Sequence, residues 1–300
     1  EIKYLRQRKC RIIYVCDAHN YSFNALKILI GRNPILIHGG GNFGDLWLTH
    51  QFFRERVVKS FPDSRIVQLP QSIYFADPAR LEQSQRIFSD HSEFHLVVRD
   101  KPSYDFAREH YTNPVYLCPD MALMLELEPK QNRSKSTDVV ILSRTDKEKK
   151  CSFNLDATAA IQCQMADWLT EPTPKNQKLY KWAHKRLAWN SKIPKTVLSL
   201  LSLYAANSMA RERLERGLGI LEQGHAVITD RLHALILSWL SNIPVSFVDN
   251  SYGKLANFVD TWLLDAPGIK KCSSFEEAIR IINSRSIVTS ANDRSRKPRN

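Results

Sequence analysis

A short polar segment after an apolar run carries the side chains best suited to chemistry. Residues 226–229 are Ala, Val, Ile and Thr, then come Asp230, Arg231 and His233, and residues 234–240 have the spacing of an amphipathic helix. This order predicts a strand, a turn and a helix. In open α/β sheets such turns line the ligand crevice. Arg231 is a permanent planar cation and His233 can exchange a proton near neutral pH. The segment therefore favours a site for an anionic substrate that is protonated during the reaction.

A purely structural interpretation of the same residues is the alternative. Asp230 would then cap the helix, and Arg231 and His233 would form a solvated first turn. A cation in the first turn opposes the helix dipole unless it pairs with an acid or a ligand. This cost favours a functional role for Arg231.

A glycine-rich segment is the second candidate. Residues 39–44 (Gly-Gly-Gly-Asn-Phe-Gly) follow an apolar run and precede a helical pattern. In this context G-x-G-x-x-G spacing lets the backbone approach a ligand, and the N–H groups at the helix start suit an anion. A dinucleotide site would place an acid at the end of the next strand, where residues 69–72 (Leu-Pro-Gln-Ser) stand instead, so NAD is disfavoured. Alternatively Asp45 simply caps the helix. We expect a phosphate or a carboxylate beside Gly39, Gly40, Gly41 and Asn42.

Further polar residues follow other apolar runs. Arg99 with Asp100, Asp120 and Arg144 each come directly after or close to the end of an expected strand. Each has a simpler explanation, such as an ion pair within Arg99-Asp100 or a helix cap at Ser103. The recurrence favours a common cleft, because two facing sheets would direct these ends toward one another. His38 and His50 could line the same cleft or be ordinary core histidines.

Several other chemistries lack their motifs. The Gly253-Lys254 pair is followed by Leu and has no upstream glycine at P-loop spacing. We find no G-x-S-x-G elbow, H-E-x-x-H pair, EF-hand loop or D-x-D pair. The sequence therefore predicts a metal-independent reaction, and we also expect no cofactor.

Composition indicates a globular protein with anionic partners. The chain has 300 residues, 43% of them hydrophobic, and no apolar run approaches the ~18 residues of a membrane span. Its net charge of +12 is concentrated at residues 147–150, 175–186 and 294–299. This charge favours phosphorylated or acidic ligands, anionic membrane surfaces or nucleic acid. Six cysteines without C-x-x-C spacing suggest buried free thiols and a cytoplasmic location.

The alternation of apolar runs and helical patterns predicts an α/β fold with two Rossmann-like domains that face each other across a cleft. We expect one domain at residues 1–130 and another at 138–290, with a linker at 129–137, an insertion near 147–194 that combines a helix with a loop, and a disordered basic tail at 291–300. Expected strands are residues 11–16, 34–38, 65–69, 94–98, 115–118, 139–142, 226–229 and 245–248. Expected helices are residues 24–30, 46–61, 79–89, 102–111, 197–217, 234–241, 254–264 and 275–283.

Five blocks in this order give the chain a family resemblance. They are residues 39–45 (GGGNFGD), Arg99-Asp100 with Ser103, Pro119-Asp120, residues 229–233 (TDRLH) and residues 249–254 (DNSYGK). Together they resemble the polysaccharide pyruvyl transferase family from the start of the chain to about Leu264. The resemblance implies two Rossmann-like domains arranged as in GT-B glycosyltransferases. It also implies transfer of the enolpyruvyl carbons of phosphoenolpyruvate onto a sugar as a cyclic ketal. Family members usually open with a strand and an Asn-x-Gly-Asp loop, and we expect that this chain begins after that point.

The resemblance assigns roles to the candidate residues. Arg231, His233 and Arg99 match the family's active-site motif positions. Our hypothesis makes His233 the general acid, with Arg231 and Arg99 holding the anionic donor, because arginine pairs bidentately with carboxylate or phosphate. Asp120 with His50 would orient or deprotonate the acceptor, and residues 39–44, Arg144, Asp230 and Lys254 would line the cleft.

The expected partners follow from this hypothesis. They are phosphoenolpyruvate and a sugar or lipid-linked oligosaccharide of exopolysaccharide biosynthesis, with a peripheral contact at the inner membrane face and no nucleic acid. Two other classes stay open. One is a GT-B-type glycosyltransferase that uses a nucleotide sugar. The other is a non-catalytic protein that binds acidic glycans or nucleic acid through its basic surface.

Overall fold

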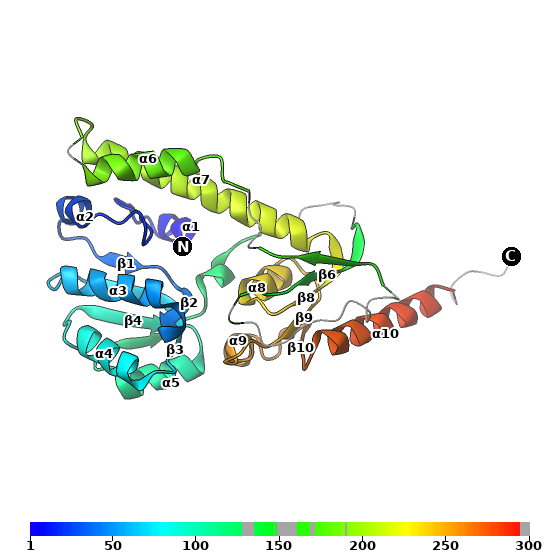
Figure 1. Ribbon diagram of the computed structural model, residues 1–300. Coiled ribbons are helices and arrows are strands. Elements are labelled where there is room, and N and C mark those ends of the chain that lie inside the picture. The colour runs from blue at the N-terminus through cyan, green and yellow to red at the C-terminus, as the bar shows by residue number, and fades with distance from the viewer. Residues whose placement is uncertain (128–134, 147, 149–160, 169–171, 190, 295–300) are drawn as a thin grey trace. The chain divides into compact units, whose positions relative to one another are not determined.

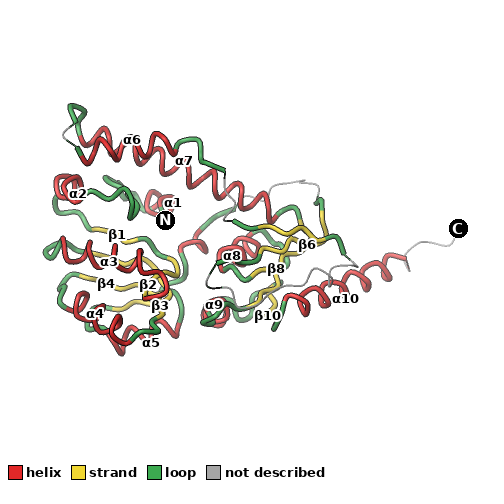
Figure 2. Tube along the Cα trace, in the orientation of Figure 1, coloured by secondary structure: helices red, strands yellow, loops and turns green. Residues whose placement is uncertain are grey.

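The computed structural model describes residues 1–127, 135–146, 148, 161–168, 172–189 and 191–294 (Figure 1). The chain divides into two compact units. The N-terminal unit comprises Glu1–Leu125 and Pro172–Leu214, and the C-terminal unit comprises Glu126–Glu171 and Glu215–Asn300. Each unit contains a parallel sheet, so the chain has the mixed α/β fold that the alternating pattern predicts (Figure 2).

The N-terminal unit is built on a sheet of order β1-β3-β4-β5, in which β2 also pairs with β3. Helices α3, α4 and α5 connect successive strands and lie along one face of the sheet (Figure 1). Phe94, Leu96 and Val98 are completely buried in the core, whereas His95 and Val97 between them are only half-buried. The strands are β1 (Ile35–Ile37), β2 (Gly40–Gly44), β3 (Ile66–Tyr74), β4 (Phe94–Val98) and β5 (Val115–Leu117). The helices are α1 (Ile2–Gln7), α2 (Phe23–Ile30), α3 (Leu48–Ser60), α4 (Pro78–Ser89), α5 (Lys101–His110) and α6 (Gln177–Ala188), with 3₁₀ turns at Asp45–Trp47 and Met121–Met124.

The C-terminal unit has a sheet of order β10-β9-β8-β6-β7, with every pair parallel. In chain order this is the 2-1-3-4-5 arrangement of doubly wound folds, which places the topological switch point between β6 and β8. The strands are β6 (Thr137–Leu142), β7 (Cys163–Ala166), β8 (Gly224–Thr229), β9 (Val245–Val248) and β10 (Ile269–Cys272). The helices are α8 (Leu232–Leu240), α9 (Lys254–Trp262) and α10 (Phe275–Arg294), and α7 (Lys195–Leu221) is shared between the two units.

The expected strand at residues 11–16 is wrong, because these residues form no strand. Part of this segment instead packs on a helix: the hydroxyl of Ser199 in α7 donates to the carbonyl of Ile13. The carbonyl of Ile13 thus accepts its hydrogen bond from a helix side chain rather than from the N–H group of a neighbouring strand.

The glycine-rich segment is also not the loop that the spacing suggested. Residues 40–44 form β2, which pairs with the second half of β3 through Gly40↔Gln71, Phe43↔Ile73 and Gly44↔Tyr74. The strand expected at residues 65–69 stops one residue before Pro70, which has no N–H group to donate to a neighbouring strand. The strand instead continues through a register shift between Gln68 and Gln71.

Residues 172–189 and 191–194 of the expected insertion belong to the N-terminal unit, whereas the sequence placed the insertion in the C-terminal domain. Residues 161–168 stay with the C-terminal unit, where β7 pairs with β6. Ala25 of α2, Leu187 of α6 and Leu198 of α7 share one buried cluster. These long-range apolar contacts place residues 172–214 with the first sheet.

Smaller differences concern the edges and ends of elements. The sequence missed β7 and β10, which are short edge strands; β10 carries exposed Lys270 and Lys271, a composition that resembles a loop. Helix α10 continues to Arg294, so residues 291–294 of the expected tail are helical, and residues 295–300 lie outside the described residues. Residues 129–134 of the expected linker are also outside them.

Two further findings concern thiols and membranes. Of the cysteines that the structure describes, none forms a disulfide and only Cys272 is buried, so the expectation of generally buried thiols is wrong for the half-buried and exposed ones. Across the described ranges, no helix combines the length and apolar character needed to cross a bilayer.

Candidate functional site

The predicted site residues lie near the carboxyl ends of parallel strands in both units. Arg99 and Asp100 follow β4, and Asp120 follows β5 after two residues. In the other unit, Arg144 follows β6 after one residue, and Asp230 follows β8 directly. Each unit therefore carries its own cluster of charged side chains at the sheet edge where parallel α/β folds bind ligands.

Arg99 is completely buried and joins three parts of the N-terminal unit. Its Nε donates to the hydroxyl of Ser72 at 2.9 Å, and its Nη1 donates to Oδ2 of Asp120 at 2.5 Å. The Ser72 hydroxyl in turn donates to Asp100 at 2.6 Å. The simple ion pair within Arg99-Asp100 is thus not the arrangement found, because Asp100 is the N-cap of α5 and accepts from the Ser103 N–H at 2.9 Å. The Ser103 hydroxyl accepts from the N–H of Ile73 in β3.

Asp120 uses both carboxylate oxygens within the protein. While Oδ2 receives Arg99, Oδ1 accepts from the N–H of Ala122 at 2.9 Å and caps a 3₁₀ turn. The residue is 5% exposed. This geometry positions Arg99 and the segment after β5, and a role of Asp120 toward an acceptor stays a prediction.

Asn42 is the centre of a second buried network in the same unit. Its Oδ1 accepts from Arg54 Nη2 at 2.9 Å and from Gln71 Nε2 at 3.0 Å, and its N–H donates to Gln71 Oε1 at 3.1 Å. Gln68 accepts from Arg54 Nε at 2.6 Å and donates to the carbonyl of His38 at 2.9 Å. The network fixes β1, β2 and β3 relative to one another.

The glycines of β2 and its approach serve close backbone packing. A β-carbon at Gly44 would lie 1.7 Å from the Tyr74 carbonyl oxygen, and one at Gly39 would lie 2.6 Å from that of Pro70. Gly40 and Gly41 are half-buried in the strand. The Gly39 N–H donates to the carboxylate of Glu1 at 2.9 Å. In the structure this N–H group is thus paired within the chain, and its role toward a phosphate or carboxylate of a ligand stays a prediction.

His50 lies in the first turn of α3 and is exposed. Partial burial, followed by the positive charges of Arg54 and His38, lowers the pKa of His50. At neutral pH its imidazole is neutral and can accept a proton, which suits the predicted role toward a sugar hydroxyl.

Arg144 is held by two carboxylates in the C-terminal unit. Its Nε and Nη2 each donate to Asp146 at 2.9 Å, and its Nη1 lies 2.9 Å from Glu148 Oε2. Burial alone would lower the pKa of Arg144, but the bonds to Asp146 and the charge of Glu148 outweigh it and raise this pKa. The backbone N–H of Arg144 donates to Asp230 at 2.8 Å, which joins the end of β6 to the end of β8.

Arg231 lies beside this cluster and retains one donor. Its Nη2 donates to Asp167 at 2.7 Å, and its Nη1 lies 3.8 Å from Asp146. Its Nε is buried without a hydrogen-bond partner among the described residues. A buried donor without an acceptor costs about 1–3 kcal/mol, so an anionic oxygen placed there would be stabilised. Asp167 and Asp146 hold the guanidinium in place while Nε stays available.

His233 and Lys254 lie in the first turns of the two helices that follow β8 and β9. His233 is exposed in the first turn of α8, for which Arg231 is the N-cap residue. Lys254 is 8% exposed, and its Nζ lies 3.5 Å from the Glu148 carboxylate that also binds Arg144. The structure thus connects Arg144, Asp230, Arg231 and Lys254 through shared carboxylates, with His233 adjacent in the chain.

Asp230 is 3% exposed and lies between these cations. Burial raises the pKa of its carboxyl to about 6, even though the Arg144 N–H and the nearby guanidinium charges oppose the increase. The folded protein therefore binds this proton more tightly than the unfolded chain does. The resulting stabilisation is complete below pH about 4 and is lost as the pH rises through about 6.

This shift makes Asp230→Asn a stability prediction. Asparagine can still accept from the Arg144 N–H but carries no charge to bury. A pKa increase of about two units corresponds to about 3 kcal/mol, so we expect the variant to gain stability relative to the parent protein at pH 8 but not at pH 4. Denaturant unfolding at both pH values measures the difference. The exposed Asp265→Asn in the same unit controls for the loss of one negative charge, and an equal gain at both pH values would contradict the shift.

The sequence missed the residues that hold the predicted cations. Asp146, Glu148 and Asp167 pair with Arg144, Lys254 and Arg231, and Asn250 donates to Glu148 at 3.1 Å. The closeness of Arg144, Asp146 and Glu148 in the chain was a usable signal, because acids two and four residues after a cation can reach it. Asp167 is far from Arg231 in the chain and gives no local signal. In the N-terminal unit, the sequence missed Arg54, Gln68, Gln71 and Ser72 as site-forming residues.

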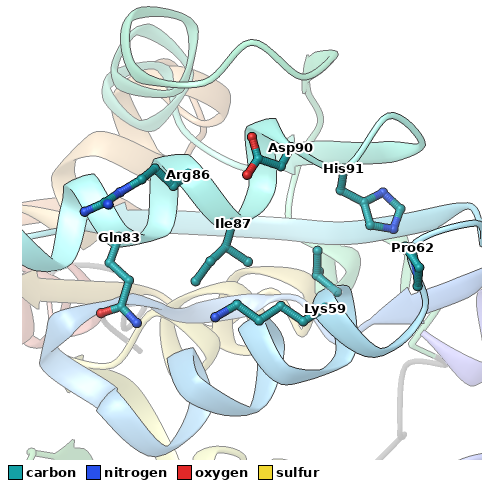
Figure 3. Close-up of a pocket in the computed structure, with 8 residues that line it drawn as sticks. Lys59, Pro62, Gln83, Arg86, Ile87, Asp90 and His91 are labelled. Carbon is teal, nitrogen blue, oxygen red and sulfur yellow. The ribbon is translucent and has the colours of Figure 1, made fainter.

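A surface cavity of about 470 Å³ lies elsewhere in the N-terminal unit (Figure 3). Lys59, Pro62, Asp90 and His91 line it, and they shortly precede β3 or β4. The cavity is therefore at the amino ends of these strands, at the sheet edge opposite to Arg99. Its position argues against a role as the main substrate site.

Comparison with known proteins gives a consistent result. The model of the family described as polysaccharide pyruvyl transferase matches residues 1–252. EpsO of Bacillus subtilis (strain 168) is 34% identical over 79% of this chain, and the chain spans 71% of its length. Pyruvyl transferase 1 of Schizosaccharomyces pombe is 32% identical over 88% of this chain, which spans 64% of that protein. In fold, the chain is similar to a crystal structure of a functionally uncharacterized Klebsiella pneumoniae protein, with a TM-score of 0.52, 18% identity, and coverage of 91% of this chain and 85% of the other.

Proposed function

Because this chain belongs to the polysaccharide pyruvyl transferase family, we propose that it transfers the enolpyruvyl group of phosphoenolpyruvate to a sugar acceptor. The product is a pyruvate ketal on a polysaccharide or on its lipid-linked precursor, formed in exopolysaccharide biosynthesis on the cytoplasmic side. The observation that carries the proposal is Arg231 Nε, a buried donor without a partner among the described residues, at the end of β8 beside the switch point. A carboxylate or phosphate oxygen of the donor substrate would bind there.

The proposed reaction begins with a proton from His233. The methylene carbon of phosphoenolpyruvate takes this proton and becomes a methyl group, while positive charge develops at the neighbouring carbon. A sugar hydroxyl attacks that carbon and loses its proton. The phosphate then leaves, and a second hydroxyl completes the ketal. The balance is one phosphoenolpyruvate and one diol converted into one ketal and one phosphate, with neither a metal nor a redox cofactor required in this proposal.

The remaining residues have positioning roles in the proposal. Arg231 binds the donor, while Arg144, Asp230 and Lys254 maintain the charged cluster around it. In the N-terminal unit, Arg99 contributes positive charge, and Asp120 with His50 orients or deprotonates the acceptor. Gly39, Gly40, Gly41 and Asn42 shape the approach. The proposal requires the two sheet edges to face a common cleft as in GT-B enzymes, and a crystal structure with phosphoenolpyruvate tests that requirement.

Thermal shift and product mass together test the proposal. We expect phosphoenolpyruvate to raise the melting temperature of the protein by mass action, and nucleotide sugars to leave it unchanged. Arg231→Lys should remove most of the shift, because an ammonium group lacks the planar set of donors. Incubation with phosphoenolpyruvate and acceptors that contain galactose, glucose or N-acetylmannosamine should release phosphate and add a ketal mass to one acceptor. Stabilisation by a nucleotide sugar alone would instead favour a glycosyltransferase.

A further inference from the structure

We propose that one face of the α6–α7 helix pair binds the surface of an anionic lipid bilayer. Helix α6, and α7 as far as Leu214, belong to the N-terminal unit, whereas Arg231 and His233 belong to the C-terminal unit. This inference adds a membrane-binding site to the proposed function and does not depend on its chemistry, because vesicle binding requires neither phosphoenolpyruvate nor an acceptor.

The charge of this segment is unusually one-sided. Residues 172–210 contain seven Lys or Arg residues and no Asp or Glu. In the whole chain, 31 acidic residues accompany 43 basic ones, so the imbalance is local. Each basic residue near an anionic bilayer contributes about 1 kcal/mol of attraction, and no acidic neighbour within the segment offsets it.

Helix α6 presents most of this charge on one face together with tryptophan. At 3.6 residues per turn, its exposed positions fall within a single sector of the helix. Trp182 is 39% exposed and Trp189, directly after the helix, is 69% exposed. The guanidinium of Arg186 lies 6.0 Å from the Trp182 ring centroid. Basic side chains interleaved with tryptophan are typical of helices that lie in the membrane interface. The exposed basic and tryptophan residues on and directly after α6 are Lys178, Lys181, Trp182, Lys185, Arg186 and Trp189.

Helix α7 adds apolar side chains. Val197, Leu200 and Tyr204 are 44%, 63% and 62% exposed. Their spacing of three and four residues places them in one row along the helix. Removing exposed Leu and Val side chains from water is favourable in free energy, and the boundary between lipid headgroups and acyl chains can accommodate these side chains.

The packing of the pair fixes which faces point outward. Tyr180 of α6 shares a buried cluster with Ala205 and Met209 of α7. At one end the Asn176 amide donates to the Ser208 hydroxyl at 2.8 Å, and at the other end Lys195 Nζ donates to the Leu187 carbonyl at 2.8 Å. The two helices therefore run antiparallel as one rigid element (Figure 1), and their exposed side chains are already arranged before a membrane binds.

The apolar row distinguishes a bilayer from the two other anionic partners. Nucleic acid or an acidic glycan would use the lysines and could stack on Trp182 and Trp189. Neither offers an apolar phase for Val197 and Leu200. The combination of cations, indole rings and aliphatic side chains therefore favours a bilayer.

Sedimentation of the full chain with lipid vesicles tests the proposal. We expect binding to vesicles of phosphatidylcholine with one part in three of phosphatidylglycerol, and at least about tenfold weaker binding to pure phosphatidylcholine. Lys181→Glu/Lys185→Glu should weaken binding to the anionic vesicles at least about tenfold. Lys270→Glu/Lys271→Glu, which makes the same charge change on exposed residues of β10, should have a much smaller effect.

A second variant tests the apolar part of the surface. Trp189→Ser/Leu200→Ser keeps every charge and should weaken binding at least about fivefold, while the blue shift of tryptophan fluorescence on vesicle addition decreases. Circular dichroism verifies that each variant is folded. If Lys181→Glu/Lys185→Glu and Lys270→Glu/Lys271→Glu weaken vesicle binding equally, the effect depends only on net charge and the proposal is overturned. Binding to RNA or to an acidic polysaccharide that is tighter than vesicle binding and equally sensitive to Leu200 would also overturn it.

Discussion

Replacing His233 by alanine is expected to lower turnover of phosphoenolpyruvate by about 10²- to 10⁴-fold, the usual contribution of a positioned general acid. His233 is exposed in the first turn of α8, and only Leu232 separates it from Arg231 in the chain. An imidazole there can deliver a proton to a substrate held by Arg231. Because the side chain is exposed, its removal leaves no buried cavity and should not unfold the protein.

His225 provides a matched control for this prediction. It is also an exposed histidine, and it lies near the opposite end of β8, the strand that leads to Arg231. His225→Ala should retain turnover. Phosphate release and ketal mass measure activity, and the thermal shift with phosphoenolpyruvate measures donor binding. The proposal expects His233→Ala to lose turnover but keep the shift, because proton delivery and donor binding belong to different side chains. Retained turnover in His233→Ala would remove this histidine from the mechanism.

The strands that form the two sheets were largely predictable from the sequence. Residues 94–98 and 245–248 form β4 and β9 with the predicted bounds, because a strand covered on both faces or at the centre of a sheet gives a short apolar run. Polar residues after such runs then predict which side chains lie at the carboxyl ends of the strands, where ligands bind in parallel α/β folds. Arg99, Arg144 and Asp230 all lie at these strand ends. The local sequence pattern was therefore sufficient to place a residue whose position is set by the strand to which it belongs.

Interactions between distant segments were not predictable in this way. The sequence indicated that Arg231 should meet an anion, and the structure supplies Asp167, from the segment after β7. Strand β7 itself was missed because residues 163–166 (Cys-Gln-Met-Ala) have no β-branched residue. Similarly, residues 11–16 have a strand-like composition but pack against α7. In both cases tertiary contacts override the local preference.

The charge balance changes what the predicted cations can do. A sequence with Arg144, Arg231 and Lys254 near one strand edge suggests an open positive site, yet Asp146, Glu148 and Asp167 neutralise much of that charge. Buried cations need such partners because desolvation of an unpaired charge is costly. Specific donor binding must then depend on geometry, such as the orientation of Arg231, more than on the overall positive charge of the chain.

The same argument gives the largest expected stability effect. Asp120→Ala removes the carboxylate that lies 2.5 Å from Arg99 Nη1, while the guanidinium stays completely buried. Breaking a buried ion pair by removing one partner costs about 3–5 kcal/mol, because the remaining charge loses its compensation. The alanine variant also loses the cap at Ala122. At about 2–4 °C per kcal/mol for a unit of this size, we expect the melting temperature to fall by roughly 10 °C.

The double variant Arg99→Met/Asp120→Ala separates the ion pair from the cap. Methionine removes the buried charge, so the double variant should be more stable than Asp120→Ala alone, a coupling that a double-mutant cycle measures directly. Asp105→Ala is the matched control, because it breaks the ion pair with Lys101 in the same unit, where Asp105 is 58% exposed, and such pairs contribute about 0–1 kcal/mol. If Asp120→Ala melts within 2 °C of the parent protein, which corresponds to ~1 kcal/mol, the carboxylate is not needed to hold Arg99. Its predicted role toward the acceptor then becomes the better explanation.

The variant Asp120→Asn decides between the two roles, with turnover measured at a temperature where the variant is folded. If Asp120 positions Arg99, the variant should lose both thermal stability and turnover. If Asp120 acts on the acceptor, the variant should lose turnover while its melting temperature stays unchanged.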